Sequence, residues 1–260
     1  MDLILLGSGN AATQLGNSLQ KAGYRFVQLF SRREENARTL SRMLSDCPYT
    51  TDLSQIDPSK ADAVISALKD SADEEVWQQI NFGNTPAFHT AGTMPMDALA
   101  PYAKHRGVLY PLQTLTKARL LDFRTVPLFI EAESPETMTL LQDMANAISD
   151  NVREVNSEQR RSIHLAAVFA NNFSNHMFAL AEKILCRYGL GFSDLLPLID
   201  ETARKVHELS PRDAQTGPAI RYDGNIMNKQ LELLADEPEM SEIYRLISAS
   251  IHNLAEESGK

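Results

Sequence analysis

The sequence predicts an α/β domain with a mostly parallel sheet, followed by an all-α domain. Three observations predict this order. Short apolar segments alternate with helical patterns over residues 1–155, which is typical of repeated β–α units. From residue 156 onward no strand pattern occurs and only helical spacing remains. The length of 260 residues suits two such domains, which we expect at 1–155 and 156–260.

The first β–α unit carries a glycine motif. Residues 3–6 are all apolar, as expected of a strand buried on both faces, and a helical pattern then runs to Gly23. Between them, Gly7, Gly9 and Ala12 form G-x-G-x-x-A. The glycines allow a tight turn and close approach of a pyrophosphate, and Ala12 allows close helix–strand packing. With the helix N–H groups facing the anion, this context favours dinucleotide binding over an ordinary βα turn.

The segment after the second expected strand, residues 24–30, indicates which dinucleotide binds. An NAD site usually has an acidic residue there for the ribose 2′-OH, whereas this chain has Ser31, Arg32 and Arg33. Ser31 and Glu34 also match an S-x-x-E capping box. The two arginines would then lie in the first helical turn, where the helix dipole disfavours cations. A bound 2′-phosphate would offset that cost, so we expect NADP rather than NAD.

Further strand patterns fill the rest of the first domain, at residues 48–51, 61–68, 86–90, 107–112, 126–132 and 152–155, with helices at 71–80 and 135–148. Segment 61–68 is expected to end beside the first strand, at the edge where ligands sit in open α/β sheets. Ala67, Leu68 and Lys69 therefore join the cofactor-binding candidates. Pro111 interrupts the strand pattern at residues 107–112, which predicts an active-site loop at residues 110–114.

The second domain is expected to begin with a long helix. Asn156 and Gln159 form a capping pair, and apolar residues then recur at helical spacing past residue 185. Residues 163–181 hold no Asp, Glu, Lys or Arg, but their His and Asn side chains make a poor membrane span. We therefore expect a buried helix, followed by helices at 193–209, 218–234 and 239–257.

Composition excludes several classes of function. A net charge of −9 with no basic face argues against nucleic acid as the main partner. Cys47 and Cys186 lie far apart and indicate neither a zinc site nor a disulfide framework, and the histidines and carboxylates show no metal-ligand spacing, so no metal is expected. With no signal peptide and no membrane span visible, we expect a cytoplasmic protein.

Several motifs together resemble one bacterial family. They are GSGNAA from Gly7, SRR from Ser31, HTAGT from His89, YPLQT from Tyr110, SEQRRSIHLAAVFANNF from Ser157 and TGPA from Thr216. The chain resembles the Rossmann-like NADP oxidoreductases with a C-terminal helical domain of unknown function. It is more distantly similar to pyrroline-carboxylate reductase, deazaflavin-dependent NADP oxidoreductase and the β-hydroxyacid dehydrogenases. The resemblance implies an N-terminal NADP-binding domain and a homodimer formed through the helical domain.

One departure from these relatives concerns catalysis. The β-hydroxyacid dehydrogenases place a catalytic lysine on the long helix after the nucleotide domain, but no lysine occurs between Ser162 and Glu182. Their mechanism is therefore not carried over. The missing lysine also keeps open an alternative function, a catalytically inactive NADP-binding sensor or partner-docking protein.

Candidate catalytic residues lie on the long helix and at one strand end. His164, Asn171 and Asn175 are separated by seven and four residues, so a regular helix would present them on one face. They are interpreted either as contacts between helices or copies, or as a polar wall facing nicotinamide and substrate. In the second interpretation His164 and His89 are candidate proton donors, because imidazole titrates near pH 7. The two asparagines would then bind the carboxamide or the developing oxyanion.

The candidate substrate-binding residues come from two loops. Thr216 precedes Pro218 in a predicted helix start, whose N-terminus would hold a substrate carboxylate with help from Thr216 and Arg221. The alternative is a plain cap with a surface arginine. Tyr110, Gln113 and Lys117 are expected to line the cleft between the two domains.

These observations predict an NADP(H)-dependent oxidoreductase. It would move a hydride between nicotinamide C4 and a C=O or C=N carbon of a small, anionic metabolite. The candidate cofactor-binding residues are Gly7, Ser8, Gly9, Asn10, Ala11, Ala12, Ser31, Arg32, Arg33, Ala67, Leu68 and Lys69.

Overall fold

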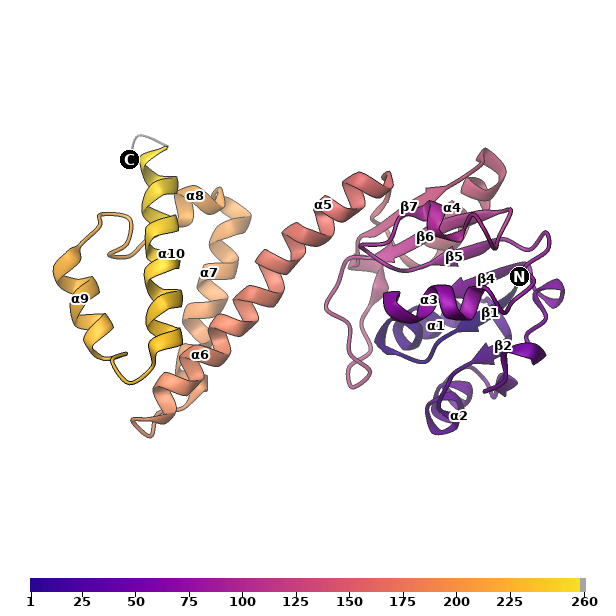
Figure 1. Ribbon diagram of the computed structural model, residues 1–260, viewed down its shortest axis with the longest axis horizontal. Coiled ribbons are helices and arrows are strands. Elements are labelled where there is room, and N and C mark those ends of the chain that lie inside the picture. Colours follow the sequence, from indigo (N-terminus) through magenta and orange to yellow (C-terminus); the bar gives the residue numbers. More distant parts are fainter. Residues whose placement is uncertain (258–260) are drawn as a thin grey trace. The chain divides into compact units, whose positions relative to one another are not determined.

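The computed structural model describes residues 1–257 (Figure 1). Contacts divide the chain into two compact units, Met1–Asn172 and a second unit that starts at Phe173. The last strand, β8 (Val152–Glu154), is followed by helix α5 (Ser157–Ala167), so strands give way to helices before the first unit ends. The division of function between residues 1–155 and 156–260 stays a prediction.

The first unit is built on an eight-stranded sheet with the strand order β3-β2-β1-β4-β5-β6-β7-β8. All neighbouring strands pair in parallel except β6 and β7, which confirms the mostly parallel sheet that the sequence predicts. The ends of β1 and β4 lie side by side, as expected. The strands are β1 (Asp2–Leu6), β2 (Arg25–Phe30), β3 (Tyr49–Thr50), β4 (Ala63–Ser66), β5 (Ala87–His89), β6 (Arg106–Pro111), β7 (Leu128–Ala132) and β8.

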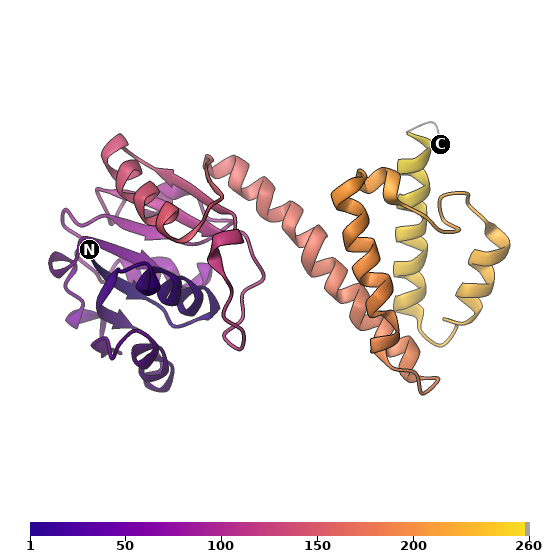
Figure 2. The ribbon, with the colours of Figure 1, turned by 180° about the vertical axis from the view of Figure 1, so that it is seen from behind.

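Helices cover both faces of this sheet. Helices α1 (Asn10–Lys21), α2 (Glu34–Met43) and α4 (Pro135–Ile148) pack in one core (Figure 2), and α3 (Asp70–Trp77) packs in the other (Figure 1). Strand β1 supplies both cores, because successive side chains of a strand point to opposite faces. Leu3 and Leu5 belong to the first core and Ile4 and Leu6 to the second. The apolar run thus forms a strand buried on both faces, as predicted.

The start of α2 differs from the prediction. The helix begins at Glu34 with Arg33 at the N-cap position, and no side chain caps it. The expected capping box of Ser31 and Glu34 is therefore wrong, because the Ser31 hydroxyl forms a 2.6 Å hydrogen bond with the Ser8 hydroxyl instead. The arginines precede the first turn, which holds Glu34 and Glu35, where the helix dipole favours acidic side chains.

A buried polar network joins β4 to α3. Trp77 is fully buried in the core, and its indole N–H donates to the Ser66 hydroxyl at 2.9 Å. The same hydroxyl donates to the Asp73 carboxylate at 2.7 Å. Asp73 itself is buried, and burial raises its pKa to about 7. A carboxyl group here is stable mainly in its protonated form.

The second unit consists of helices α6 (Ser174–Cys186), α7 (Leu196–Glu208), α8 (Pro211–Ala214), α9 (Gly224–Glu232) and α10 (Pro238–Glu256). The predicted helix start at Pro218 is wrong. Positive φ angles at Gly217 (109°) and Tyr222 (50°) keep this segment in turns. The helix instead begins after Asp223, whose side chain accepts a hydrogen bond from the Ile226 N–H at 3.3 Å.

The long helical stretch of residues 157–186 is exposed rather than buried. Asn156 and Gln159 form the predicted capping box at its start, but residues Val168–Phe173 form a π-helix between α5 and α6. Leu165 is 59% exposed and Phe169 is 63% exposed. The expectation of a buried helix is therefore wrong. Apolar spacing predicts a face that packs against another surface, but it does not predict that this surface belongs to the same chain. No helix within residues 1–257 is long and apolar enough to span a membrane.

The Asp73 network predicts a pH dependence of stability. The folded protein keeps a proton on Asp73 up to about pH 7, whereas the unfolded chain releases it near pH 4. Folding therefore binds a proton in this window, and Asp73 lowers stability as the pH rises through it, by on the order of 3 kcal/mol. We expect Asp73→Asn to remove this loss. Urea unfolding at pH 5 and pH 7.5 checks it: the variant gains stability over wild type at the higher pH, and a pH-independent difference contradicts the assignment.

Candidate functional site

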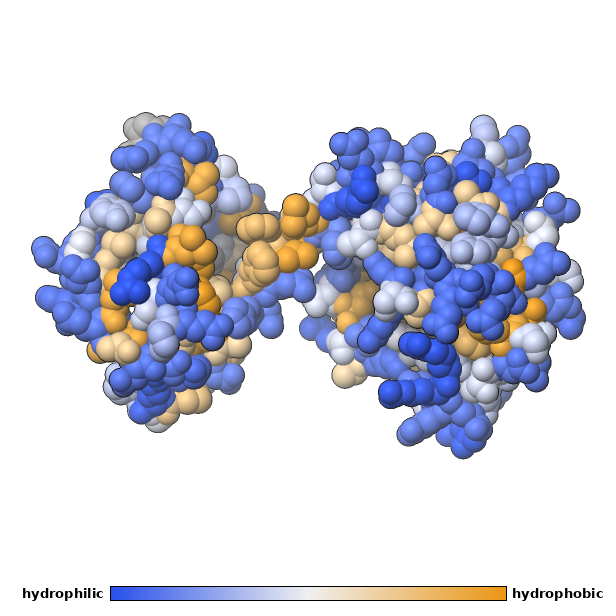
Figure 3. Space-filling model, in the orientation of Figure 1, coloured by the Kyte–Doolittle hydropathy of each residue, from blue (hydrophilic) through white to orange (hydrophobic). Residues whose placement is uncertain are grey.

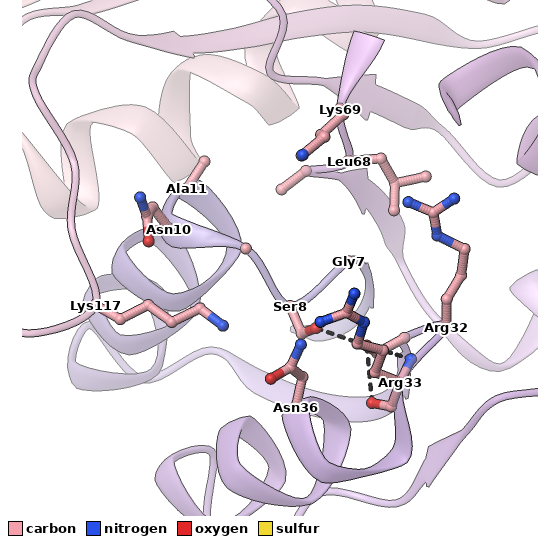
Figure 4. Close-up of a pocket in the computed structure, with 13 residues that line it drawn as sticks. Gly7, Ser8, Asn10, Ala11, Arg32, Arg33, Asn36, Leu68, Lys69 and Lys117 are labelled. Carbon is pink, nitrogen blue, oxygen red and sulfur yellow. Dashed lines mark hydrogen bonds between the residues drawn. The ribbon is translucent and has the colours of Figure 1, made fainter. Parts of the chain in front are cut away.

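A pocket of about 720 Å³ lies at the carboxyl ends of β1, β2 and β4 (Figure 4). Every predicted cofactor-binding residue except Ala12 lines it. Ala12 is fully buried beneath the pocket in the core, where its small side chain lets α1 approach the sheet. The lining residues are Gly7, Ser8, Gly9, Asn10, Ala11, Ser31, Arg32, Arg33, Asn36, Ala67, Leu68, Lys69 and Lys117.

The two glycines of the motif play different structural roles. Gly7 has a φ of 111°, and a Cβ atom there would lie 2.5 Å from the Ala67 carbonyl oxygen. Only glycine therefore allows β1 to end this close to β4. A Cβ atom on Gly9 would meet no protein atom within 4 Å, so the space beside Gly9 is open toward the pocket. Space of this kind lets a ligand approach the backbone closely.

The start of α1 can receive an anion. Gly9 occupies the N-cap position, where it offers no side chain to satisfy the first N–H groups of α1, and the first turn holds no acidic residue. Unpaired N–H groups and the helix dipole both favour negative charge at this point. The pocket therefore fits a phosphate at the helix start.

Four cationic side chains surround this pocket. Arg32 and Arg33 come from the end of β2, Lys69 from the end of β4, and Lys117 from the β6–β7 connection (Figure 4). No Asp or Glu is among the described lining residues. The pocket is thus suited to a ligand with several negative charges, although the chain as a whole is acidic.

Two lining residues extend the set that the glycine and arginine motifs define. Asn36 lies in the first turn of α2, three residues after Arg33, and Lys117 is distant from both motifs in sequence. The sequence contains a local signal that could have predicted Asn36 as a lining residue, because a polar side chain in the first helical turn after β2 lies near the end of that strand. Lys117 was expected in the cleft between the domains, and the structure places it among the residues that line this pocket.

A second cluster brings together two predicted site residues, Tyr110 and His164. The Tyr110 hydroxyl lies 3.0 Å from Nδ1 of His164, although 54 residues separate them. Tyr110 is buried, and burial raises the pKa of its phenol. Gly92, which follows β5, makes this pairing possible, because a Cβ atom there would lie 2.5 Å from His164 Nδ1. The motif HTAGT thus places its glycine where the imidazole needs space.

A buried ion pair fixes the helix that carries His164. The Arg160 guanidinium, fully buried one turn before His164, pairs with the Glu131 carboxylate of β7 and donates to the Met94 carbonyl. Ser157 also donates to Glu131, from its N–H at 3.0 Å and its hydroxyl at 2.9 Å. These bonds hold the first turn of α5 against the sheet, and this positions His164 next to Tyr110.

His89 lies at the end of β5 but does not fit the expected role of proton donor. Its ring is fully buried, and Nδ1 accepts a hydrogen bond from the Ala91 N–H at 3.2 Å. Burial, together with the nearby Arg160 charge, lowers the pKa of His89 to about 4. The ring is neutral at pH 7 and has no access to a substrate, so we leave it out of the proposed catalytic set.

The asparagines expected beside His164 are not brought to it. The π-helix at Val168–Phe173 fits an extra residue into one turn, which offsets the faces before and after it by about 100°. The seven-residue step from His164 therefore no longer returns to the same face. Asn171 and Asn175 are both exposed, and no hydrogen bond within residues 1–257 joins either one to His164 or Tyr110.

The remaining substrate candidates belong to two other parts of the chain, the β6–β7 connection and the second unit. Gln113 is exposed in the β6–β7 connection, where its side chain accepts from the Thr114 N–H. Thr216 lines an apolar groove of about 360 Å³ in the second unit, and Arg221 is exposed. This groove has no cation among its described lining residues and does not fit a carboxylate. Within residues 1–257, no group of three or more His, Cys, Asp or Glu side chains could hold a metal ion.

Comparison with known proteins links this geometry to a group of related chains. Residues 126–251 match a family described as a domain of unknown function (DUF2520). The solved structure of a "putative NADP oxidoreductase" from Bacteroides fragilis is 49% identical, with a TM-score of 0.92 over 97% of this chain and 98% of that one. No curated protein matches the sequence.

More distant solved structures share the fold. A 1-pyrroline-5-carboxylate reductase from Streptococcus pyogenes is 15% identical, with a TM-score of 0.65 over 97% of this chain and 98% of that one. A reductive aminase from Aspergillus terreus, in complex with NADPH and ethyl-5-oxohexanoate, is 10% identical, with a TM-score of 0.73 over 98% and 94%. At these identities the likeness shows the fold alone, a Rossmann-type domain followed by helices.

Alanine substitutions at the two glycines are predicted to affect the stability of the ligand-free protein to different degrees. Gly7→Ala forces a Cβ atom against the Ala67 carbonyl and a positive φ on an alanine, which we expect to lower the free energy of unfolding by about 1–3 kcal/mol. Gly9→Ala meets no neighbour and is expected to change it by less than about 0.5 kcal/mol. Chemical denaturation of both variants is the measurement. Equal losses would contradict the roles assigned to the two positions.

Proposed function

Because the chain belongs to the family of Rossmann-type NADP oxidoreductases with a helical C-terminal domain, we propose that it binds NADP(H) in the cationic pocket and transfers a hydride. The hydride moves between nicotinamide C4 and a C=O or C=N carbon of a small metabolite. The observation that carries this proposal is the pocket itself, in which the uncapped start of α1 and four cationic side chains surround a space of about 720 Å³.

The residues at the end of β2 support NADP over NAD. An Asp or Glu at this point would bind a ribose 2′-OH and repel a 2′-phosphate. This chain instead places the Arg32 and Arg33 side chains along the pocket, with the Ser8–Ser31 hydroxyl pair between them and the glycine turn. Guanidinium groups bind phosphate oxygens with charge-assisted, often bidentate, hydrogen bonds. We assign the 2′-phosphate to Ser31, Arg32 and Arg33, and the pyrophosphate to Gly7 and the residues at the start of α1.

Bound NADPH supplies the hydride, and the chain must supply a proton to the reduced group. We place the proton donor at the Tyr110–His164 pair, whose tyrosine lies near the carboxyl end of β6. The 3.0 Å contact allows a proton to pass between the phenol and the imidazole, and the raised pKa keeps Tyr110 protonated at pH 7. Arg160 and Glu131 act as positioning residues because they fix the helix that carries His164.

The bond that is reduced is proposed to be C=N or C=O. Two proteins with this fold are, by name, a pyrroline-carboxylate reductase and a reductive aminase, which supports C=N as the first class to screen. An anionic substrate stays a prediction, because the groove that includes Thr216 has an apolar lining. The asparagine pair is kept as a candidate only for contacts with the substrate.

The second unit is proposed to form a homodimer, which the family resemblance implies. Large apolar side chains gather on its surface (Figure 3), and a large exposed apolar patch usually marks an interaction surface. The exposed ones include Tyr188, Leu190, Leu196, Leu198, Val206, Leu209, Leu233, Leu246 and Leu254. A second copy of the chain would cover these side chains, and the molar mass in solution tests this proposal.

Removal of one guanidinium tests the choice of cofactor. We expect Arg32→Ala to weaken NADPH binding about 10- to 100-fold, since a hydrogen bond to a charged group is worth about 1.5–3 kcal/mol, and to leave NADH binding within about twofold. Titration followed by nicotinamide fluorescence gives both dissociation constants. An equal loss for the two cofactors would contradict the 2′-phosphate assignment.

Substitution at the Tyr110–His164 pair tests the chemistry. We expect Tyr110→Phe and His164→Ala to slow NADPH oxidation with cyclic imines by about 10²–10⁴-fold and to leave NADPH binding within about twofold, because the pair acts on the proton. The control is Arg32→Ala, whose effect should lie in cofactor binding. NADPH binding by the wild-type protein with no turnover on any imine or carbonyl tested would favour the catalytically inactive sensor.

A further inference from the structure

A buried glutamine holds the chain connection that covers one side of the nucleotide pocket. Gln14 lies on α1 and is fully buried. Its side-chain amide donates to the Thr116 carbonyl at 2.5 Å and to the Arg119 carbonyl at 2.7 Å, and its oxygen accepts from the Leu121 N–H at 3.1 Å. One side chain therefore ties three backbone groups of the β6–β7 connection to the helix that starts at the pocket.

These bonds matter because the exposed part of the connection, residues 116–120, has few other attachments. Residues 116–120 are exposed, whereas Leu115 and Leu121 on either side pack against the core. An exposed segment of this length samples many conformations unless specific bonds hold it. The buried amide has both a donor and an acceptor in use, so replacing it with an apolar side chain removes the bonds and leaves backbone groups unpaired.

The held segment carries a cation into the pocket. Lys117 lies between the carbonyl groups that Gln14 binds, and its ammonium group points into the pocket from the side of Asn10 (Figure 4). It forms no ion pair with any residue in the described range 1–257. Arg119, two residues further, is exposed and does not line the pocket. The bonds to Gln14 thus select one cation of this connection for the pocket.

We propose that Lys117 binds a phosphate oxygen of the dinucleotide and that Gln14 is the positioning residue that holds Lys117 there. This inference rests on the proposed binding of NADP(H). It adds a ligand from a part of the chain that neither the glycine motif nor the β2 arginines include. Cofactor affinity then depends on a hydrogen-bond network behind the pocket as well as on the groups inside it.

The first test compares two cations of the same connection. We expect Lys117→Met to raise the dissociation constant for NADPH about tenfold, and Lys117→Arg to restore it to within about threefold, because the arginine keeps the charge. The matched control Arg119→Met removes one charge nearby and should change it less than twofold. An equal rise for NADPH and NADH assigns Lys117 to the pyrophosphate, and a rise for NADPH alone assigns it to the 2′-phosphate.

The second test asks whether Gln14 acts through Lys117. We expect Gln14→Met to raise the NADPH dissociation constant about as much as Lys117→Met, and the double variant to bind no more weakly than Lys117→Met alone. A purely structural defect would instead add to the Lys117 effect. Hydrogen exchange of the amides in residues 112–121 should accelerate in Gln14→Met, with thermal unfolding confirming that the variant is folded.

The outcomes separate this inference from the function on which it rests. If wild-type protein binds NADPH and Lys117→Met binds it as tightly as Arg119→Met does, the inference is wrong and the proposed function stands. If Gln14→Met and Lys117→Met add in the double variant, Gln14 does not position Lys117. If the wild-type protein binds no NADPH, the proposed function itself fails.

Discussion

The pocket proposed to bind the nucleotide depends on how closely two strands approach each other at Gly7. A side chain there would collide with the Ala67 carbonyl, so the absence of one allows β1 and β4 to end together beneath the pocket. This single contact places the start of α1, the β2 arginines and Lys69 around one space. The charges inside the pocket then act on a ligand at short range, where a few cations outweigh the acidic character of the whole chain.

Much of the fold could be predicted from the sequence because its signals are local. Residues 3–6 form a strand with no polar alternation, Asn156 and Gln159 cap a helix across one turn, and the resemblance to the NADP oxidoreductase family is confirmed. The predictions were wrong where a local sequence signal is overridden by another contact or by the backbone conformation. Ser31 bonds to Ser8 rather than capping α2, and positive φ angles hold residues 217–222 in turns although Pro218 suits a helix start. Apolar spacing along a helix also does not predict whether the surface that covers it belongs to the same chain.

The candidate site divides in the same way. The glycine turn and the β2 arginines are adjacent in sequence to the elements that position them, so their place in the pocket follows from strand order alone. The pairing of Tyr110 with His164 could not be predicted, because it depends on the Arg160–Glu131 ion pair and on the space left by Gly92. His89 shows the opposite case. Its position at a strand end suggested chemistry, but complete burial removes it from contact with a substrate.

The antiparallel pairing of β6 and β7 has a consequence for how the pocket can change. Two antiparallel neighbours need only two to five residues between them, so residues 112–127 are more than this pairing requires, and their exposed part at 116–120 contributes no side chain to the core. If β7 paired in parallel with β6, the chain would have to cross to the opposite edge of the sheet, and residues 112–127 would be needed for that crossover. Here these residues stay at the edge where the nucleotide pocket opens. Substitutions or changes of length in this exposed segment can alter the side of the pocket while the core strands keep their sequence. The affinity for the proposed cofactor can therefore evolve separately from the stability of the fold.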